Sequence, residues 1–363
     1  MTAGSEGQVR RDMSESSGYL PAEWAPQVAV MLTWPHEDSD WRPWLAQVEP
    51  VFVRIAAEVA RREDVVIVCR DAALAGRVRG LLGAAGVDLA RVRLHAVPTQ
   101  DTWARDHGPI TVVRKGWPLL LDFGFNGWGG KFAADLDDQI SRRLHALGAF
   151  DGAALASVEL VLEGGSVECD GAGTLLTTRR CLLAGTRSGL SEAELTVHLT
   201  ALFGLERVLW LDHGHLAGDD TDGHIDTLAR FTDRETIAYQ GCDDPGDPNF
   251  ADLQAMAAEL AGLRTLAGGP YRLVALPWPR ARFAVDGSRL PASYANFLII
   301  NDAVLVPTYD DPADARALAL LQGCFPGREV VGIDCTAVIE QYGSLHCLTM
   351  QLPAPLSLGP GTA

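Results

Sequence analysis

Paired cysteines, long apolar runs and an excess of positive charge are all missing from this sequence. The seven cysteines follow no CxxC spacing, and an odd, irregular set argues for reduced thiols over a disulfide framework or a zinc ribbon. Residues 1–18 contain no apolar h-region, so no signal peptide is expected, and no apolar run approaches membrane-spanning length. We therefore expect a cytoplasmic protein with no membrane partner.

The charge balance of the chain is acidic. Lys and Arg number 30 against 47 Asp and Glu, which gives a formal net charge of −17. A phosphate backbone would be repelled, so nucleic acid is disfavoured as a partner, whereas small cations would be attracted. The sequence leaves a homo-oligomer open.

The chain divides into one large folded region and two short ends. We expect residues 1–18 to form a disordered leader, residues 19–353 to form a single catalytic domain, and residues 354–363 to form a flexible tail. Within the domain a unit of strand, strand, helix and strand recurs four times, with hairpins expected at 110–123, 165–178, 224–240 and 296–308. Strands expected at 28–33 and 344–351 would complete a fifth unit across the termini, which predicts an α/β fold closed into a ring with its sheets inward.

Polar residues gather where the first hairpin strand of each unit begins. These stretches are 103–109, 163–165, 222–226, 294–297 and 346–347. In a ring they would converge on one axis, so a thiol, an imidazole and up to three carboxylates would share a cavity. His224 and Asp226 lie one residue apart on a predicted strand and should face the same side. Tyr294 and Asn296 are expected to be structural or to form the wall.

Cys347 is the candidate nucleophile of this cavity. A free cysteine is more often a buried structural residue, and a thiol with a pKa of roughly 8.5 needs an activating partner. Two Asp side chains could hold a planar guanidinium by bidentate pairs while a thiolate attacks its central carbon. The set therefore indicates chemistry on a small cationic guanidine.

Each site residue also has a plainer interpretation. Asp106 could pair with Arg105 at the surface, Glu163 could simply open a hairpin, and His224 could be a satisfied core histidine. A rival metal site, for which the sequence offers no HExxH spacing, would use His213, His215, Asp219, Asp220, Asp222, His224 and Asp226.

Seven stretches together resemble the agmatine deiminase and bacterial peptidylarginine deiminase family, in the guanidine-modifying pentein superfamily. They are 20–24 (LPAEW), 33–36 (TWPH), 101–109 (DTWARDHGP), 163–165 (EGG), 219–231 (DDTDGHIDTLARF), 294–297 (YANF) and 346–349 (HCLT). They span about residues 20–352, and the WxRDxGP, GHID and HCxT elements are specific as an ordered set.

The resemblance implies a five-bladed pseudo-symmetric α/β propeller of strand-strand-helix-strand repeats, the pentein fold, with no metal or organic cofactor. It implies Cys347 as nucleophile, His224 as general acid and base, and Glu163 as the group that orients His224. Asp106 and Asp226 would bind the guanidinium, and Trp103 would wall the alkyl stem of the substrate.

One departure from the family pattern bears on the substrate. Agmatine-specific members of the family carry a sequence that resembles Gly-Gly-Gly-Asn just before Ile-His-Cys. In this chain Gln341 and Tyr342 stand in place of two of those glycines. Side chains thus occupy a loop where backbone could approach a ligand. We expect an agmatine deiminase that acts through a covalent thiouronium. The alternatives are a deiminase of another guanidine such as peptidyl-arginine, a guanidino-group amidinotransferase, or a non-enzymatic pentein.

Overall fold

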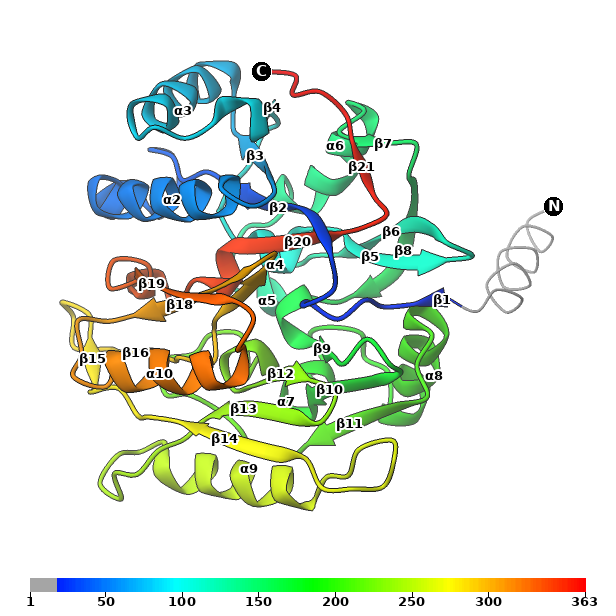
Figure 1. Cartoon of the computed structure of the whole chain (residues 1–363), viewed down its shortest axis with the longest axis vertical. Coiled ribbons are helices and arrows are strands. Elements are labelled where there is room, and N and C mark those ends of the chain that lie inside the picture. The colour runs from blue at the N-terminus through cyan, green and yellow to red at the C-terminus, as the bar shows by residue number, and fades with distance from the viewer. Residues whose placement is uncertain (1–17) are drawn as a thin grey trace.

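A computed structural model describes residues 18–363. The predicted disordered leader therefore lies outside the described residues, except for Gly18, which opens strand β1 (Gly18–Tyr19) against β5 (Ile110–Arg114). Among residues 18–363 no helix is long and apolar enough to cross a membrane. The molecule is a mixed α/β protein, with long helices at the periphery of Figure 1 and strands nearer its middle.

Five sheets share one topology, in which an antiparallel hairpin is extended by a parallel strand. Four of them are β5-β6-β8, β9-β10-β11, β12-β13-β14 and β17-β18-β19. Their bounds are β6 (Trp117–Gly124), β8 (Ala154–Val161), β9 (Glu168–Cys169), β10 (Thr174–Thr178), β11 (Arg207–Leu211), β12 (Ala229–Asp233), β13 (Thr236–Gln240), β14 (Arg272–Leu276), β17 (Leu298–Ile300), β18 (Ala303–Thr308) and β19 (Glu329–Asp334).

The fifth sheet joins the two ends of the chain. Its order is β20-β2-β3-β4, built from β20 (Thr349–Pro353), β2 (Gln27–Thr33), β3 (Asp64–Cys69) and β4 (Val92–Ala96). Strand β20 pairs antiparallel with β2, and β2 pairs in parallel with β3, which repeats the pattern of the other four sheets. The predicted pairing of the strands expected at 28–33 and 344–351 is confirmed, and Figure 1 shows β20 (red) beside β2 (blue).

A helix precedes the outer parallel strand in each unit. These helices are α2 (Leu45–Ala60), α3 (Ala72–Ala84), α6 (Ile140–Ala146), α8 (Glu192–Phe203), α9 (Phe250–Gly262) and α10 (Asp314–Cys324). The S-x-x-E spacing of Ser191 and Glu194 predicts a capping box at the start of α8, and the box is present, because each side chain bonds the backbone N–H of the other residue. The pair Asp311-Pro312 predicts an N-cap followed by proline at the first helical position of α10, and this prediction is wrong: Asp311 Oδ1 accepts from Ala313 N in a turn, and the helix begins at Asp314.

In four units a single helical turn precedes the first strand of the sheet. In three of these units the sequence predicts a strand in place of the turn. These turns are α4 (Ala104–His107), η4 (Gly164–Ser166), η5 (Ile225–Thr227) and η7 (His346–Leu348). In three of them a hydroxyl closes the turn by donating to a carbonyl three residues back: Ser166 to Glu163, Thr227 to His224, and Thr349 to His346. The predicted strand starts at 165, 224 and 344 are therefore wrong, since this local bond competes with the sheet ladder.

The remaining short elements connect these units. They are α5 (Gly127–Gly130), α7 (Arg179–Leu182), β7 (Phe150–Asp151), β15 (Arg282–Phe283), β16 (Arg289–Leu290), β21 (Ser357–Leu358), η1 (Arg42–Trp44), η2 (Leu89–Arg91), η3 (Asp137–Gln139) and η6 (Ile339–Gln341). The C-terminal segment, expected as a flexible tail, pairs β21 with β7, and the N–H of Thr362 donates to Leu94 O.

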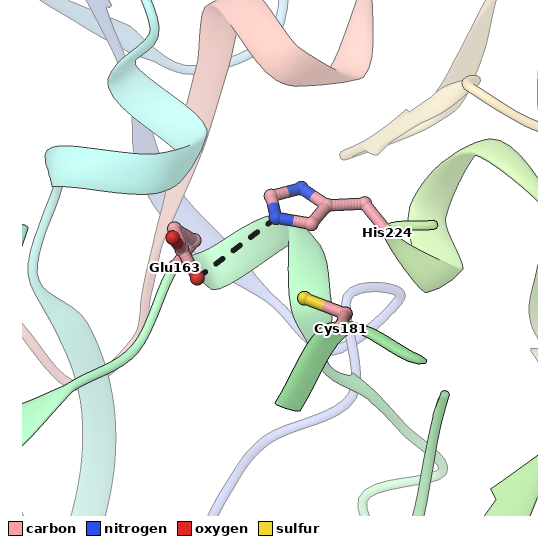
Figure 2. A group of neighbouring side chains, drawn as sticks. All are labelled: Glu163, Cys181 and His224. Carbon is pink, nitrogen blue, oxygen red and sulfur yellow. Dashed lines mark ion pairs between the residues drawn. The ribbon is translucent and has the colours of Figure 1, made fainter. Parts of the chain in front are cut away.

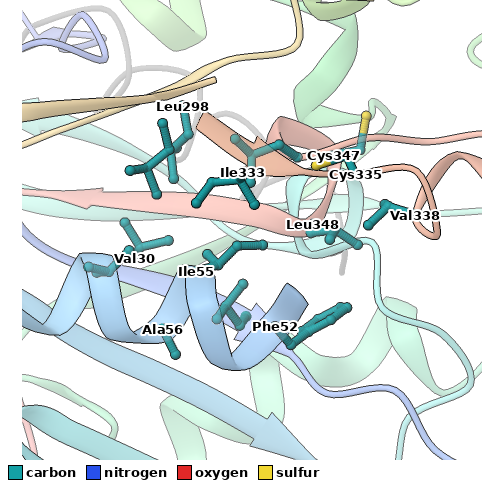
Figure 3. Packing of buried hydrophobic residues seen from close by; sticks show 14 of the residues in the cluster. Val30, Phe52, Ile55, Ala56, Leu298, Ile333, Cys335, Val338, Cys347 and Leu348 are labelled. Atoms are coloured by element: carbon teal, nitrogen blue, oxygen red, sulfur yellow. The ribbon is translucent and has the colours of Figure 1, made fainter. Parts of the chain in front are cut away.

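The turn that carries Cys347 rests on a large hydrophobic cluster. Figure 3 shows Phe52 and Ile55, which project from α2, in one cluster with Leu348, Cys347 and Ile333. Burying each such side chain contributes about 1.5–3 kcal/mol. Leu348 is fully buried next to the thiol, so packing of α2 between two sheets fixes the backbone of η7.

Candidate functional site

Cys347 lies in η7 with a side chain that is almost completely enclosed, since the residue is 4% exposed. Its Sγ is 3.3 Å from Asn296 Nδ2 and 3.8 Å from Asp226 Oδ2. Asn296 Oδ1 also accepts from the N–H of His346 at 2.8 Å, which holds the turn. Asn296, expected to be structural or to form the wall, therefore contacts the thiol directly.

His224 stands at the start of η5 and is fully buried. Its Nδ1 lies 3.7 Å from Asp106 Oδ1, and its Nε2 lies 4.0 Å from Glu163 Oε2. Neither ring nitrogen has a hydrogen-bond partner among residues 18–363. Burial opposes a charge on this ring, but the carboxylates of Asp106 and Glu163 raise the pKa of His224 well above its ordinary value.

Asp106 belongs to α4 and is buried, so the surface pair with Arg105 is wrong. Its Oδ2 accepts from Trp128 Nε1 at 2.9 Å, and its Oδ1 accepts from Gly165 N at 3.1 Å. Burial raises the pKa of Asp106 to about 6, against the opposing charge of His224. The sequence predicts an extended segment at Arg105 and Asp106, but Arg105 lies in the helical turn α4 and pairs with Glu23 at 3.6 Å.

Gly165 marks the point on which the side chains converge. A Cβ placed there would lie 2.6 Å from His224 Nδ1, 2.9 Å from Asp106 Oδ1 and 3.1 Å from Asp226 Oδ2. Any larger residue would displace these groups. The prediction that His224 and Asp226 face the same side is met through the η5 turn and not through strand alternation.

Asp226 is fully buried and has two different oxygens. Oδ2 lies 2.7 Å from His346 Nδ1, whereas Oδ1 has no hydrogen-bond partner within the described part of the chain. Burial would raise the pKa of Asp226, but the neighbouring His346 and His224 rings lower it. This carboxyl group is therefore held ionised, with one oxygen free to accept from a ligand.

Glu163 has a partner that the sequence does not reveal. Arg187 donates from Nε to Glu163 Oε1 at 3.1 Å, and both side chains are fully buried. The same guanidinium pairs with Asp222 and donates to Thr221 O at 2.9 Å. Arg187 thus fixes the carboxylate that faces His224, although nothing in the sequence around it suggests such a role.

An aromatic wall lies beside these groups. The ring of Trp103 is 5.7 Å from that of Trp41 and 6.4 Å from that of Trp128, measured between centroids. Gly343 lies flat against Trp103, because a Cβ there would overlap the ring. Tyr342 lies in the loop that differs from the glycine-rich pattern of the family. Its backbone is left-handed, with a φ of 64°, a conformation that glycine would adopt without strain.

A second layer of buried charges supports the site. Glu23 Oε2 lies 2.7 Å from His346 Nε2 and 2.9 Å from Arg230 Nη2, and Arg230 Nε donates to Glu168 at 2.6 Å. Glu23 and Arg230 belong to motifs quoted above, but their roles are visible only in three dimensions. A cavity of about 40 Å³ borders this layer through Arg105 and His346, and its lining does not include Cys347.

The rival metal site does not form. His213 is exposed and lies 3.1 Å from Asp252, away from His224, and His215 is 3.8 Å from Asp219. A different group could hold an ion: of the residues from 18 onward, only Glu163, Cys181 and His224 bring three suitable ligand atoms within 4.8 Å of one another.

An imidazole and two carboxylates converge on Gly165, and one of these carboxylates lies 3.8 Å from a buried thiol, a set that is typical of a cysteine-dependent enzyme that acts on a cationic carbon centre. A sequence model of the Porphyromonas-type peptidyl-arginine deiminase family matches residues 19–353, and the chain belongs to that family. The predicted family resemblance is confirmed.

Known relatives span nearly the whole chain. The agmatine deiminase of Pseudomonas aeruginosa (strain LESB58) is 35% identical, covering 93% of this chain and 95% of that protein. The structure of a putative arginine deiminase from Porphyromonas gingivalis is 53% identical, with a TM-score of 0.88 over 93% of this chain and 99% of the other. The C. jejuni agmatine deiminase with substrate bound is 34% identical, with a TM-score of 0.85 over 93% and 96%.

Proposed function

We propose that this protein hydrolyses agmatine to N-carbamoylputrescine and ammonia through a covalent intermediate on Cys347. The observation that carries the proposal is the convergence of His224, Asp106 and Asp226 on Gly165, next to the Cys347 thiol. The choice of agmatine is supported by the relatives named agmatine deiminase at 33–35% identity and by the C. jejuni enzyme with substrate bound.

The guanidinium would lie between two carboxylates. Its planar fork of N–H groups matches carboxylate geometry, and Asp226 Oδ1 is buried without a partner among residues 18–363. Trp103 would pack along the alkyl stem, since its ring forms the nearby aromatic wall. The net charge of −17 favours approach of a dication such as agmatine.

In the first half-reaction the thiolate of Cys347 adds to the guanidinium carbon. Burial, followed by Asp226 and Asp106, raises the pKa of Cys347 well above its ordinary value, so the resting group is a thiol. A bound cation offsets the two carboxylate charges and favours loss of the thiol proton to solvent. The protonated His224 then gives its proton to the departing nitrogen, ammonia leaves, and an S-alkylthiouronium cation remains.

In the second half-reaction neutral His224 removes a proton from water, which adds to the thiouronium carbon. Collapse of this adduct breaks the C–S bond and releases the ureido product. The second proton from water returns to Cys347, and the released ammonia takes the proton that the thiol lost. The enzyme therefore ends with His224 protonated and Cys347 as a thiol, as it began.

Three further residues would position these groups. Glu163, held by Arg187, faces Nε2 of His224 and would orient the ring, so that Nδ1 points toward Asp106 and the substrate. His346 would hold Asp226 through Oδ2 and leave Oδ1 for the guanidinium. These roles are those of positioning residues, because none of the three is proposed to bond to the reacting carbon.

The proposal extends to the arrangement of the whole chain. We infer that residues 19–353 form one catalytic domain whose five sheets surround a single axis as a five-bladed α/β propeller, because the helical turns α4, η4, η5 and η7, each from a different unit, meet at one site. The seven cysteines are unpaired, which suits a reducing cytoplasm. The partner would be a small cationic guanidine, with neither nucleic acid nor membrane, and a homo-oligomer stays open.

The substrate within the guanidine class needs a direct test, because the 53% identical relative from Porphyromonas gingivalis is named an arginine deiminase and not an agmatine deiminase. Arginine would bring an α-carboxylate that needs a cation. The buried guanidinium groups near the site are already engaged, Arg105 and Arg230 by Glu23 and Arg187 by Glu163. We therefore expect agmatine to be preferred over arginine.

The test is ammonia release, with kcat/KM measured for agmatine, arginine, a peptide ending in arginine, and guanidinoalkylamines with shorter and longer chains. We expect agmatine to give the highest value. If arginine or the peptide exceeds it, the agmatine assignment is wrong and deiminase chemistry remains. If every guanidine is inert with a folded protein whose Cys347 still reacts with thiol reagents, the deiminase proposal is wrong.

A further inference from the structure

Cys181 lies beside the catalytic imidazole, because its sulfur, a Glu163 oxygen and a His224 nitrogen are all within 4.8 Å of one another. It lies in the one-turn helix α7 and is fully buried. Figure 2 shows its sulfur directed toward the space between the His224 ring and the Glu163 carboxylate, and the dashed line joins the latter two groups. The mechanism above makes no use of this second thiol.

The position of Cys181 is fixed from both sides. Thr178 caps the start of α7 by accepting from the N–H of Cys181 at 3.3 Å. The same hydroxyl donates to Gly223 O at 2.7 Å, which ties the turn to the residue before His224. One hydroxyl therefore holds the backbone at Cys181 to the backbone just before His224.

The three side chains offer the donor set that zinc prefers. A thiolate sulfur, an imidazole nitrogen and a carboxylate oxygen are common Zn²⁺ ligands, and three protein ligands leave a fourth position for water. Zinc bonds of about 2.0–2.3 Å in a tetrahedral site place ligand atoms about 3.3–3.8 Å apart. Here the three atoms lie within 4.8 Å of one another, so small side-chain rotations close the site. Both His224 nitrogens are buried without hydrogen-bond partners in the described chain, so Nε2 is available.

We propose that Glu163, Cys181 and His224 form a zinc site, occupied by Zn²⁺ in competition with catalysis. Binding forms Zn–S, Zn–N and Zn–O bonds and releases to solvent the thiol proton of Cys181 and the Nε2 proton of His224. Zinc therefore binds more tightly as pH rises.

The charges around the site set its strength. Arg187 donates to Glu163 and opposes a dication, but the same guanidinium is also paired with Asp222. The Cys181 thiolate and the Glu163 carboxylate together balance Zn²⁺, and Asp222 balances Arg187. We expect a reversible inhibitory site and not a permanently loaded structural one.

The inhibition, unlike the metal binding, rests on the proposed function. A metal ion on Nε2 prevents His224 from carrying the proton that the leaving nitrogen requires. Zinc would thus inhibit a deiminase without touching Cys347. A chelator such as EDTA would restore activity.

Metal titration of the full-length protein separates this site from one built on Cys347. Co²⁺ bound to a thiolate gives a near-ultraviolet charge-transfer absorption, and competition with a chromophoric chelator gives the zinc Kd. Even outer-shell changes cost roughly 10–100-fold in metal affinity, so we expect Cys181→Ser and Cys181→Ala each to weaken zinc binding by about 100-fold or more and to abolish the cobalt band. The matched variant Cys347→Ala should retain both.

Two outcomes overturn the proposal. One is a Cys181→Ser protein, folded by circular dichroism, that binds zinc as tightly as the wild type. The other is loss of the cobalt band in Cys347→Ala, which would place the metal on the nucleophile. Because the cobalt band and the Kd do not depend on turnover, a protein inactive toward every guanidine would refute the proposed function while leaving the metal site to be judged separately.

Discussion

Asp226 Oδ2 lies 2.7 Å from His346 Nδ1, while the other oxygen of this buried carboxylate has no hydrogen-bond partner among residues 18–363. The His346 ring continues to Glu23 at 2.7 Å, so one imidazole bridges two carboxylates. Glu23 and His346, which are 323 positions apart in the sequence, are thereby linked next to the nucleophile Cys347. This bridge leads to the first prediction.

His346→Asn should lower kcat/KM for agmatine by about tenfold or more, since an asparagine cannot span both carboxylates and an unsatisfied buried group costs roughly 1–3 kcal/mol. Guanidine affinity, measured by calorimetry with an unreactive analogue, should fall as well, because Asp226 loses its fixed orientation. His213→Asn, which removes an exposed contact with Asp252, is the matched control and should change neither quantity. Unchanged affinity in a folded His346→Asn protein would remove the positioning role.

Cys347→Ala should abolish turnover and leave the protein folded. The alanine removes the only atom proposed to bond to the guanidinium carbon, while Leu345 and Leu348 still anchor the turn. Cys69→Ser, in strand β3, is the control and should keep nearly full kcat. Measurable deimination by a homogeneous Cys347→Ala preparation would refute covalent catalysis.

His224→Asn should abolish turnover, because one imidazole serves both half-reactions. The reaction should stop either before the covalent intermediate forms or before water releases it. Brief exposure to agmatine followed by intact-protein mass spectrometry should reveal an adduct on Cys347 or no chemistry at all. A normal rate in this variant would show that the acid and base lie elsewhere.

Agmatine binding should weaken as pH falls through about 6. Burial raises the pKa of Asp106 to about 6, and only the ionised carboxylate pairs with a guanidinium. Below this pKa the ionised fraction of Asp106 falls by up to about tenfold per pH unit, so the Kd of agmatine for Cys347→Ala should rise accordingly as the pH falls from about 6 to 5. Asp106→Asn should bind about 100-fold more weakly or worse and lose the inflection, since breaking a buried charge pair costs about 3–5 kcal/mol. A Kd that does not vary with pH in Cys347→Ala would exclude Asp106 from the binding site.

Much of this architecture could be predicted from local patterns. The expected hairpins around 110–123 and 296–308 are present as β5-β6 and β17-β18, and the two chain ends share one sheet. The helical turns at the site were missed because an apolar run suggests a continuous strand. A signal was available: Ser166, Thr227 and Thr349 each stand three residues after a site residue and bond its carbonyl.

Other features could not be predicted, because they depend on residues that are distant in the sequence. Arg187 lies 24 residues from Glu163 in a stretch without a motif, and only folding buries the pair together. Glu23 is visible in a motif, yet its contacts with His346 and Arg230 come from the opposite end and the middle of the chain. Cys181 belongs to no sequence motif, because its proposed role as a metal ligand depends only on its distance from His224 in the folded chain.

The central claim, hydrolysis of agmatine at Cys347, is tested most directly by turnover in water enriched in oxygen-18 with an amine acceptor also present. The account predicts one ammonia per agmatine consumed and N-carbamoylputrescine that carries a single oxygen-18 atom in its ureido group, with no such product from Cys347→Ala. Transfer of the amidino group to the added amine without incorporation of the label would identify an amidinotransferase instead. Recovery of unchanged agmatine from a folded, thiol-reactive enzyme would contradict the account.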